Sequence, residues 1–261
     1  MNIIVCIKQV PGTTDVKIDS KTNTLKREGV EAIINPFDMY ALEEGLRLRE
    51  RYGGKVTVLS MGPPQVEAAL REAVALGVDE SILLSDRAFA GADTLATSYT
   101  LAKGIHKLGD FDLVICGKQA IDGDTAQVGP GVAETMGIPY VTCVRKIEDI
   151  KDKKIILERM METGFEVVEL PLPVLITVVK EINEPRLPSL KGMMKSKKAN
   201  IAVWKLQDLG CDEEKSGLKG SPTQVIKVFS PPPREGGEMI IGESRVQVEK
   251  LVQKLRDNKV I

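Results

Sequence analysis

The stretch Leu113-Val-Ile-Cys-Gly-Lys-Gln-Ala-Ile-Asp-Gly-Asp-Thr-Ala-Gln-Val-Gly129 decides the expected fold. It opens with the apolar run 113–116, which is typical of a buried strand, and it leads into a helical pattern over 125–136 that Gly137 closes. The residues between the two are rich in glycine, aspartate and threonine. In an open α/β sheet, ligands bind at strand-to-helix loops of this kind.

The same alternation of strand and helix precedes this stretch. Asn35 is a good N-cap, Pro36 suits the first position of a helix, and Gly53-Gly54 ends that helix. A hairpin made by 16–19 and 24–27 interrupts the alternation. The pattern predicts βαβ units whose right-handed crossovers bring the strand C-termini to one edge of a parallel sheet. The expected strands are 3–10, 55–61, 81–85 and 113–116, and the expected helices are 36–52, 63–76, 93–108 and 125–136.

The pattern changes after residue 140, where β-like runs follow one another with little helix between them. They predict either an antiparallel appendage or an extension of the sheet, and they are 141–147, 154–160, 165–170 and 174–179. From residue 180 the chain is loop-like and basic, and the last amphipathic helix is expected at 244–256. We therefore expect a doubly wound α/β domain over 1–200, mainly parallel with an antiparallel extension. We expect residues 201–261 to form an arm that wraps a partner subunit, and a locally docked or disordered tail is the alternative.

Composition excludes several classes of function. The 261 residues carry a formal net charge of -1 and only 4% aromatic residues, so a nucleic-acid partner is not expected. We expect no signal peptide, and no apolar stretch reaches the roughly 18 residues that span a bilayer. The four cysteines are scattered, which fits free thiols in a reducing compartment and no metal site. We expect a cytoplasmic protein without membrane insertion.

Two loops carry the signals for nucleotide binding. In the loop that begins at Gly117, glycines permit close approach of a ligand, Thr125 is expected to cap the following helix, and Gln127 can bond a phosphate, ribose or base. In the loop 85–94, Asp93 or Thr94 would cap a helix and a pyrophosphate could rest near Thr97. Arg87 would be a charge partner there or simply solvated. The alternative for both loops is an ordinary connection rich in turn residues.

No catalytic constellation accompanies these loops. The sequence has neither G-x-G-x-x-G after its first strand nor a G-x-x-x-x-G-K-[ST] motif. Its single histidine, His106, falls within a predicted helix and is interpreted as structural. Any redox chemistry must therefore come from a bound cofactor.

The segment 183–198 combines two prolines with apolar and basic residues. Leu187, Leu190, Met193 and Met194 are apolar, and several lysines surround them. An apolar anchor ringed by charge fits a docking element. A loop that packs its Leu and Met inward is the equally supported alternative.

These residues resemble the small (beta) subunit of electron-transferring flavoproteins over nearly the whole chain. The marks are Asn35-Pro-Phe37, Met61-Gly-Pro63, Gly117-Lys-Gln-Ala-Ile-Asp122, Asn183-Glu-Pro-Arg186 and Met194-Lys-Ser-Lys-Lys198. The resemblance implies a heterodimer with a large (alpha) subunit that carries a mobile FAD domain. The small subunit would bury AMP or a second FAD in its α/β core.

The resemblance also implies residue roles. The segment 183–198 matches the recognition loop, in which Leu190, with Met193, Met194 and Lys195 nearby, would enter a pocket on an acyl-CoA dehydrogenase. The residues that would line the nucleotide site are Cys6, Asn35, Asp38, Met61, Gly117, Lys118, Gln119, Asp122, Gly123, Asp124, Thr125, Gln127 and Val128.

One segment departs from the respiratory form, which holds structural AMP. Asp86-Arg-Ala-Phe-Ala-Gly-Ala-Asp-Thr94 resembles the anaerobic, electron-bifurcating branch. There the small subunit binds FAD, with Thr94 and Thr97 near the pyrophosphate, and NADH gives this flavin a hydride. One electron would pass through the large-subunit FAD to an acyl-CoA dehydrogenase-type or lactate dehydrogenase-type partner, and the other to ferredoxin or flavodoxin. The alternatives are an AMP-holding subunit and a non-redox adenine-nucleotide-binding module.

Overall fold

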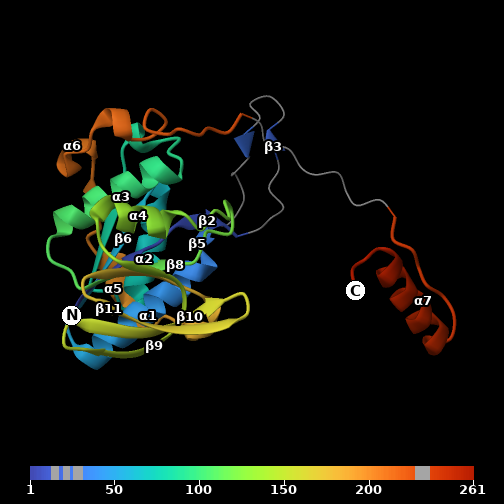
Figure 1. Ribbon diagram of the computed structural model, residues 1–261. Helices are drawn as coiled ribbons and strands as arrows, with labels where there is room; N and C mark the ends of the chain where they lie inside the picture. The colour runs from blue at the N-terminus through green and yellow to red at the C-terminus, as the bar shows by residue number, and fades with distance from the viewer. Residues whose placement is uncertain (13–17, 20–23, 26–31, 227–235) are drawn as a thin grey trace. The chain divides into compact units, whose positions relative to one another are not determined.

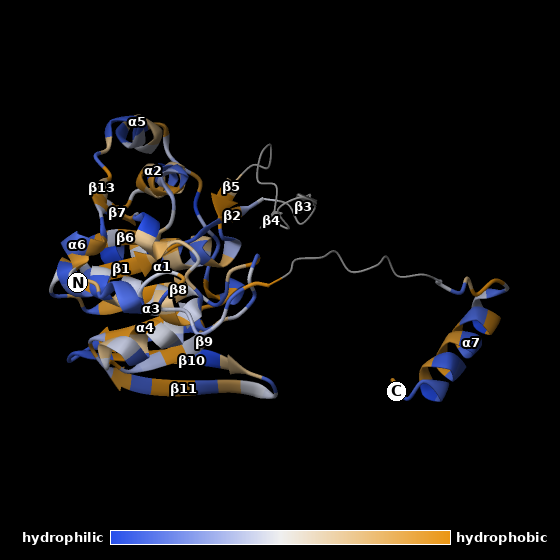
Figure 2. Cartoon of the chain, turned by 90° about the horizontal axis from the view of Figure 1, so that it is seen from above, coloured by the Kyte–Doolittle hydropathy of each residue, from blue (hydrophilic) through white to orange (hydrophobic). Residues whose placement is uncertain are grey.

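The computed structural model describes residues 1–12, 18–19, 24–25, 32–226 and 236–261 (Figure 1). The chain divides into two units, Met1–Ile226 and Lys227–Ile261. The first contains a nine-stranded sheet with helices on both faces. The second contains helix α7 (Ser244–Asp257), along which polar and apolar residues alternate in Figure 2.

The sheet has the order β11-β10-β9-β12-β8-β1-β6-β7-β13. From β9 to β13 in this order neighbouring strands are parallel, whereas β10 pairs antiparallel with both β9 and β11. The parallel sheet with an antiparallel extension that we expected is therefore confirmed. The bounds are β1 (Asn2–Cys6), β6 (Lys55–Met61), β7 (Glu80–Leu84), β8 (Leu113–Gly117), β9 (Tyr140–Lys151), β10 (Lys154–Met161), β11 (Gly164–Pro171), β12 (Val174–Val178) and β13 (Ala202–Trp204).

Two hydrophobic cores form because successive residues of a strand point to opposite faces of the sheet. Val5 of β1 packs in the core under α1 (Pro36–Tyr52) and α2 (Glu67–Leu76). Its neighbour Ile4 packs in the other core, under α3 (Thr94–Leu108) and α4 (Val128–Met136). A 3₁₀ turn, η1 (Pro64–Val66), precedes α2 as part of the expected helix 63–76.

The direction of the chain reverses beside β1. From β1 the chain passes to β6 and β7 on one side, and α3 then returns it to β8 on the other side of β1. Such a topological switch point is where an open α/β sheet forms a crevice outside the strand C-termini. The ends of β1 and β8 are therefore the place to look for a site.

The N-terminal strand is shorter than expected. The run 3–10 divides into β1 and β2 (Gln9–Pro11), and β2 pairs with β5 (Ala32–Ile34) in a separate small sheet. In the predicted hairpin, β3 (Ile18–Asp19) pairs antiparallel with β4 (Thr24–Leu25). The outer parts of that hairpin lie outside the described residues.

The chain after residue 180 contains more regular structure than its composition suggested. After η3 (Lys180–Ile182), the expectation of a loop is wrong for α5 (Leu190–Lys198), because the Ser189 hydroxyl accepts the N–H of Gly192 and caps a helix. Beyond the predicted domain boundary at residue 200, β13 joins the sheet, followed by α6 (Leu206–Leu209) and η4 (Glu213–Lys215). The division between the two units falls after Ile226. No helix in the described part of the chain is long and apolar enough to cross a membrane.

Candidate functional site

The start of α1 meets the ends of β1 and β8. Asp38, in the first turn of α1, accepts the N–H of Lys8 at 2.7 Å and the N–H of Gly117 at 3.2 Å through its two carboxylate oxygens. A Cβ at position 117 would lie 2.3 Å from Oδ1 of Asp38 and 2.6 Å from the carbonyl carbon of Phe37. Only glycine therefore allows β8 to end so close to α1.

Asp38 is buried, and its ionisation is correspondingly unusual. Burial raises the pKa of Asp38 to about 7, although hydrogen bonds from Lys8, Asn35 and Gly117 oppose this shift. The pKa of the Asp38 carboxyl group, which lies beside the ends of β1 and β8, is therefore near neutrality.

Asn35 stands at the N-cap position of α1, as expected, but its side chain makes no capping bond with that helix. Instead, Nδ2 donates to the carbonyl oxygen of Gln119 at 2.8 Å, and Oδ1 accepts the N–H of Ile121 at 3.1 Å. Because Asn35 is fully buried, it fixes the first half of the 117–128 loop to the start of α1. Its role is to position the loop.

Lys8 is a residue of the site that the sequence did not reveal. Its Nζ donates to both carboxylate oxygens of Asp122, at 2.6 and 2.8 Å. Asp122 is therefore paired within the chain and is not a free ligand group. Next to it, Nε2 of Gln119 donates to the carboxylate of Asp124. Lys118 belongs to the same loop and donates its backbone N–H to Val178 at 2.9 Å.

The start of α4 differs from the prediction. The helix begins at Val128 with Gln127 at the N-cap, and the expectation that Thr125 caps it is wrong. Asp124 and Ala126 both have φ of 53°, a left-handed conformation that a helix does not allow. A left-handed residue followed by the right-handed Gln127 is a conformation in which successive N–H groups can form a concavity for an anion.

Among the described residues no side chain caps α4, so the N–H groups of Val128 and Gly129 are left to a ligand or to solvent, whereas Pro130 has no N–H. The loop in front of it is open. Residues 121–127 are exposed, and nothing lies within 4 Å of the position where a Cβ of Gly123 would stand. This end of the loop therefore has both the donors and the space for an anionic group.

The start of α3 is different, because Asp93 is its N-cap as expected. One oxygen of Asp93 accepts the N–H groups of Leu95 and Ala96 at 2.9 and 3.1 Å. The other accepts the N–H and the hydroxyl of Thr223 at 3.1 and 2.8 Å. Burial alone would raise the pKa of Asp93, but these hydrogen bonds together lower it. A charged carboxylate with satisfied partners thus occupies the start of α3.

The starts of α3 and α4 lie side by side. The Thr94 hydroxyl donates to Oε1 of Gln127 at 3.0 Å, and the Ser98 hydroxyl lies 3.3 Å from the carbonyl oxygen of Val128. Thr97 is half-buried in the first turn of α3, and Arg87 is exposed in the 3₁₀ turn η2 (Arg87–Phe89) before it. The two predicted loops are therefore brought together at one edge.

Two further residues of the predicted site are the last residues of strands that end at this edge. Cys6 is buried at the end of β1, in register with Cys116 of β8, and Met61 is half-buried at the end of β6. A hydrogen bond to Cys6 and burial raise the pKa of the Cys116 thiol well above its usual range. Cys116 therefore stays protonated and is not activated as a nucleophile.

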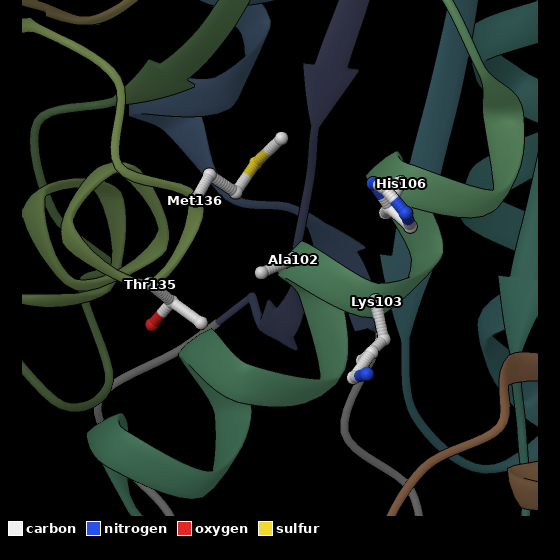
Figure 3. A pocket seen from close by; sticks show the side chains of 5 residues that line it. All are labelled: Ala102, Lys103, His106, Thr135 and Met136. Carbon is white, nitrogen blue, oxygen red and sulfur yellow. The ribbon is translucent and has the colours of Figure 1, made fainter.

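A hollow of about 320 Å³ lies elsewhere, between α3 and α4 (Figure 3). Because its residues belong to the C-terminal parts of these helices, it faces the sheet edge opposite to the loops. His106 is exposed there and has no place in the candidate site. The lining residues are Ala102, Lys103, His106, Thr135 and Met136. Among the residues that the structure describes, no group of His, Cys, Asp or Glu could hold a metal ion.

The segment 183–198 presents its apolar residues outward. Leu190 is 78% exposed and Met194 is 70% exposed, so the alternative in which they pack inward is wrong. Met193 is also exposed, and Lys195 Nζ donates to the carbonyl oxygen of Val78 at 3.3 Å. Lys195 is thus occupied within the chain.

The fold and this edge define a doubly wound α/β protein with a candidate ligand site at the switch point of its sheet. The electron transfer flavoprotein domain matches residues 22–209. The chain belongs to the beta-subunit family of electron transfer flavoproteins, as its motifs suggested. A subunit of this kind implies an alpha subunit as its partner.

Individual relatives cover almost the whole chain. It is 53% identical over 262 residues to the electron transfer flavoprotein subunit beta of Thermoanaerobacterium thermosaccharolyticum, with 100% of both chains covered. It is 52% identical to the caffeyl-CoA reductase-Etf complex subunit CarD of Acetobacterium woodii, again with 100% of both chains covered. With protein FixA of Bradyrhizobium diazoefficiens it shares 44% identity, over 97% of this chain and 90% of the relative.

Proposed function

We propose that this chain is the small subunit of an electron-bifurcating flavoprotein and that it holds FAD at the C-terminal edge of β1 and β8. One observation carries the proposal: the N-cap residue of α4, Gln127, makes no side-chain cap and follows the left-handed Ala126 in an open loop. Free N–H groups and the helix dipole favour a phosphate at that point.

The residues of the edge have different roles in this proposal. The backbone around Gln127 and Val128, with the hydroxyls of Thr94 and Thr97, would hold the pyrophosphate. Gly123 leaves room for the cofactor. The loop-positioning residues are Lys8, Asn35, Asp38 and Asp122, and Cys6 and Met61 would form the floor.

Bound FAD would supply the conversion of a two-electron donor into one-electron transfers. The proposed reaction takes a hydride from NADH and divides its electrons between two routes. One route leads through the alpha-subunit FAD to an acyl-CoA dehydrogenase-type or lactate dehydrogenase-type flavoenzyme, and the other leads to ferredoxin or flavodoxin. The relative named as a subunit of a caffeyl-CoA reductase complex supports an acyl-CoA-linked partner. We place the complex in the cytoplasm, with α5 docking the flavoenzyme through Leu190.

Cofactor analysis of the complex with the alpha subunit tests the proposal. The complex should be yellow, should release two FAD per heterodimer, and should lose part of its flavin absorbance on addition of NADH. One FAD with one AMP would assign the chain to the respiratory form and overturn the bifurcating reaction. An adenine nucleotide without any flavin, and no bleaching by NADH, would make it a non-redox nucleotide-binding module.

A further inference from the structure

Arg186 joins the segment 183–198 to helix α1. Its guanidinium lies between two carboxylates of that helix, with Nε 2.7 Å from Oε2 of Glu43 and Nη1 2.5 Å from Oε1 of Glu50. Nη2 reaches the second oxygens of both groups, at 3.2 and 3.1 Å. The planar guanidinium is thus fixed by four hydrogen bonds, a geometry that lysine cannot reproduce.

We call the arrangement of Arg186 between Glu43 and Glu50 the clamp. The burial of Glu43 strengthens it. Glu43 is 4% exposed, and Arg47 also donates to it, at 2.6 Å. Burial alone would raise the pKa of Glu43, but the hydrogen bonds from Arg186 and Arg47 lower it. Glu43 therefore remains charged, and removal of Arg186 would leave that charge less well compensated.

Further contacts fix the residues around Arg186. Asn183 Nδ2 donates to the carbonyl oxygen of Tyr40 at 3.0 Å and to Glu44 at 2.9 Å. Arg47 donates to the carbonyl oxygen of Glu184 at 3.1 Å. The chain is therefore held to α1 immediately before the exposed apolar residues.

Helix α5 is also held by contacts with α2 that do not involve Arg186. A Cβ at Gly192 would lie 2.0 Å from the carbonyl oxygen of Ala75, so α5 packs directly against the end of α2. Arg71 donates to the carbonyl oxygens of Ser196 and Ala199 at 2.7 and 3.2 Å. Between these contacts and Arg186, Leu187 remains 88% exposed. An exposed apolar stretch is thus held at both ends.

We propose that Arg186 is a positioning residue that orients the apolar side chains of 187–194 for docking to the partner flavoenzyme. This inference rests on the proposed function. A stretch ordered before docking loses less conformational entropy when it binds, so the clamp lowers the cost of association. The lysines of α5 make an apolar pocket with an acidic rim the matching surface on the partner.

The test uses the heterodimer with its alpha subunit and purified butyryl-CoA dehydrogenase as the probe. We compare Arg186→Gln with the wild type by partner KM, kcat, flavin content and hydrogen exchange of residues 187–194. The variant should raise the partner KM about tenfold and speed exchange in this segment, with kcat and flavin content unchanged. Arg186→Lys should restore only part of the difference, because lysine cannot bridge both carboxylates.

Two further variants separate positioning from folding. Glu50→Gln removes the more exposed half of the clamp and leaves Arg186 on Glu43, so it should raise KM by about threefold. In the double variant with Arg186→Gln the two effects should not add. Arg51→Gln, on the same helix, is the control and should change none of these values.

The outcomes are distinct for the two proposals. An unchanged partner KM and unchanged exchange in both Arg186→Gln and Glu50→Gln would overturn the role of Arg186. A wild-type heterodimer that holds two FAD but fails to couple to the dehydrogenase would overturn the proposed partner, and the docking role with it. If Arg186→Gln does not fold, as judged by thermal unfolding, Glu50→Gln alone decides the question.

Discussion

The loops after β7 and β8 both lead into a helix at the same edge of the sheet, yet the two helices begin in different ways. At α3, Asp93 caps the helix and is itself bonded by Thr223. At α4, the loop passes through left-handed residues, and Gln127 makes no side-chain cap. At the start of α3, a side chain of this chain accepts the free N–H groups. At the start of α4, free N–H groups remain as donors for another group.

This difference assigns the two loops different tasks. A carboxylate at the start of α3 repels a phosphate there, whereas the start of α4 attracts one. The α4 start also lies on a loop that other elements hold firmly, through Asn35 and the Lys8–Asp122 ion pair. If the proposed function holds, we expect the phosphate of the nucleotide to lie nearer to Val128 than to Thr94.

The largest effect is expected for Asn35→Ala. The change leaves the carbonyl oxygen of Gln119 and the N–H of Ile121 without their partner and opens a buried space. The free energy of unfolding should fall by about 2–4 kcal/mol, and cofactor retention should fall strongly. Urea unfolding of the chain and flavin analysis of the heterodimer measure the two effects. Normal retention would show that the loop needs no fastening to α1.

A pH-dependent effect on stability distinguishes the carboxyl groups of Asp38 and Asp93. The folded pKa of Asp38 is raised to about 7 from 3.8, so its contribution to stability is complete below the unfolded value and is lost as pH rises through about 7. The wild type should therefore lose stability relative to Asp38→Asn between about pH 4 and pH 7, with little further change above that range. A difference that stays constant over this range would contradict the raised pKa. For Asp93, whose pKa is lowered, stability is instead lost toward acid pH.

The smallest effect is expected for Asp93→Ala. Loss of an N-cap costs about 1 kcal/mol in helix stability, and Thr223 also loses its partner. Because the proposed phosphate position lies at α4, flavin content should remain close to that of the wild type. Thermal unfolding and cofactor analysis of the same preparation test both statements. A heterodimer that releases only one FAD would place the phosphate at α3 and reverse the comparison.

Much of the fold follows from local signals. Alternating apolar periodicity, Asn35-Pro36 at the start of α1 and Asp93 at the start of α3 placed the helices correctly. Helix α5 was missed because two prolines and a run of lysines resemble a loop. Ser189, directly after the second proline, was the available signal for its start.

The site was harder to predict in detail. The sequence identified the loop at 117–128, but it gave Thr125 the role of a cap, since nothing local reveals the left-handed conformation of Ala126. Asn35 was correctly placed at a helix start, but its side chain serves another segment. Lys8 and Arg186 act on residues distant in the chain, and such pairings depend on tertiary approach.

The account depends on a phosphate at the start of α4, and one variant tests it most directly. Gln127→Asp gives α4 the carboxylate that α3 already has, which should repel the phosphate without loosening the loop. We predict that the Gln127→Asp heterodimer folds normally but retains less than about a tenth of the second nucleotide, measured by cofactor release after gel filtration. Full retention of that nucleotide would contradict the account.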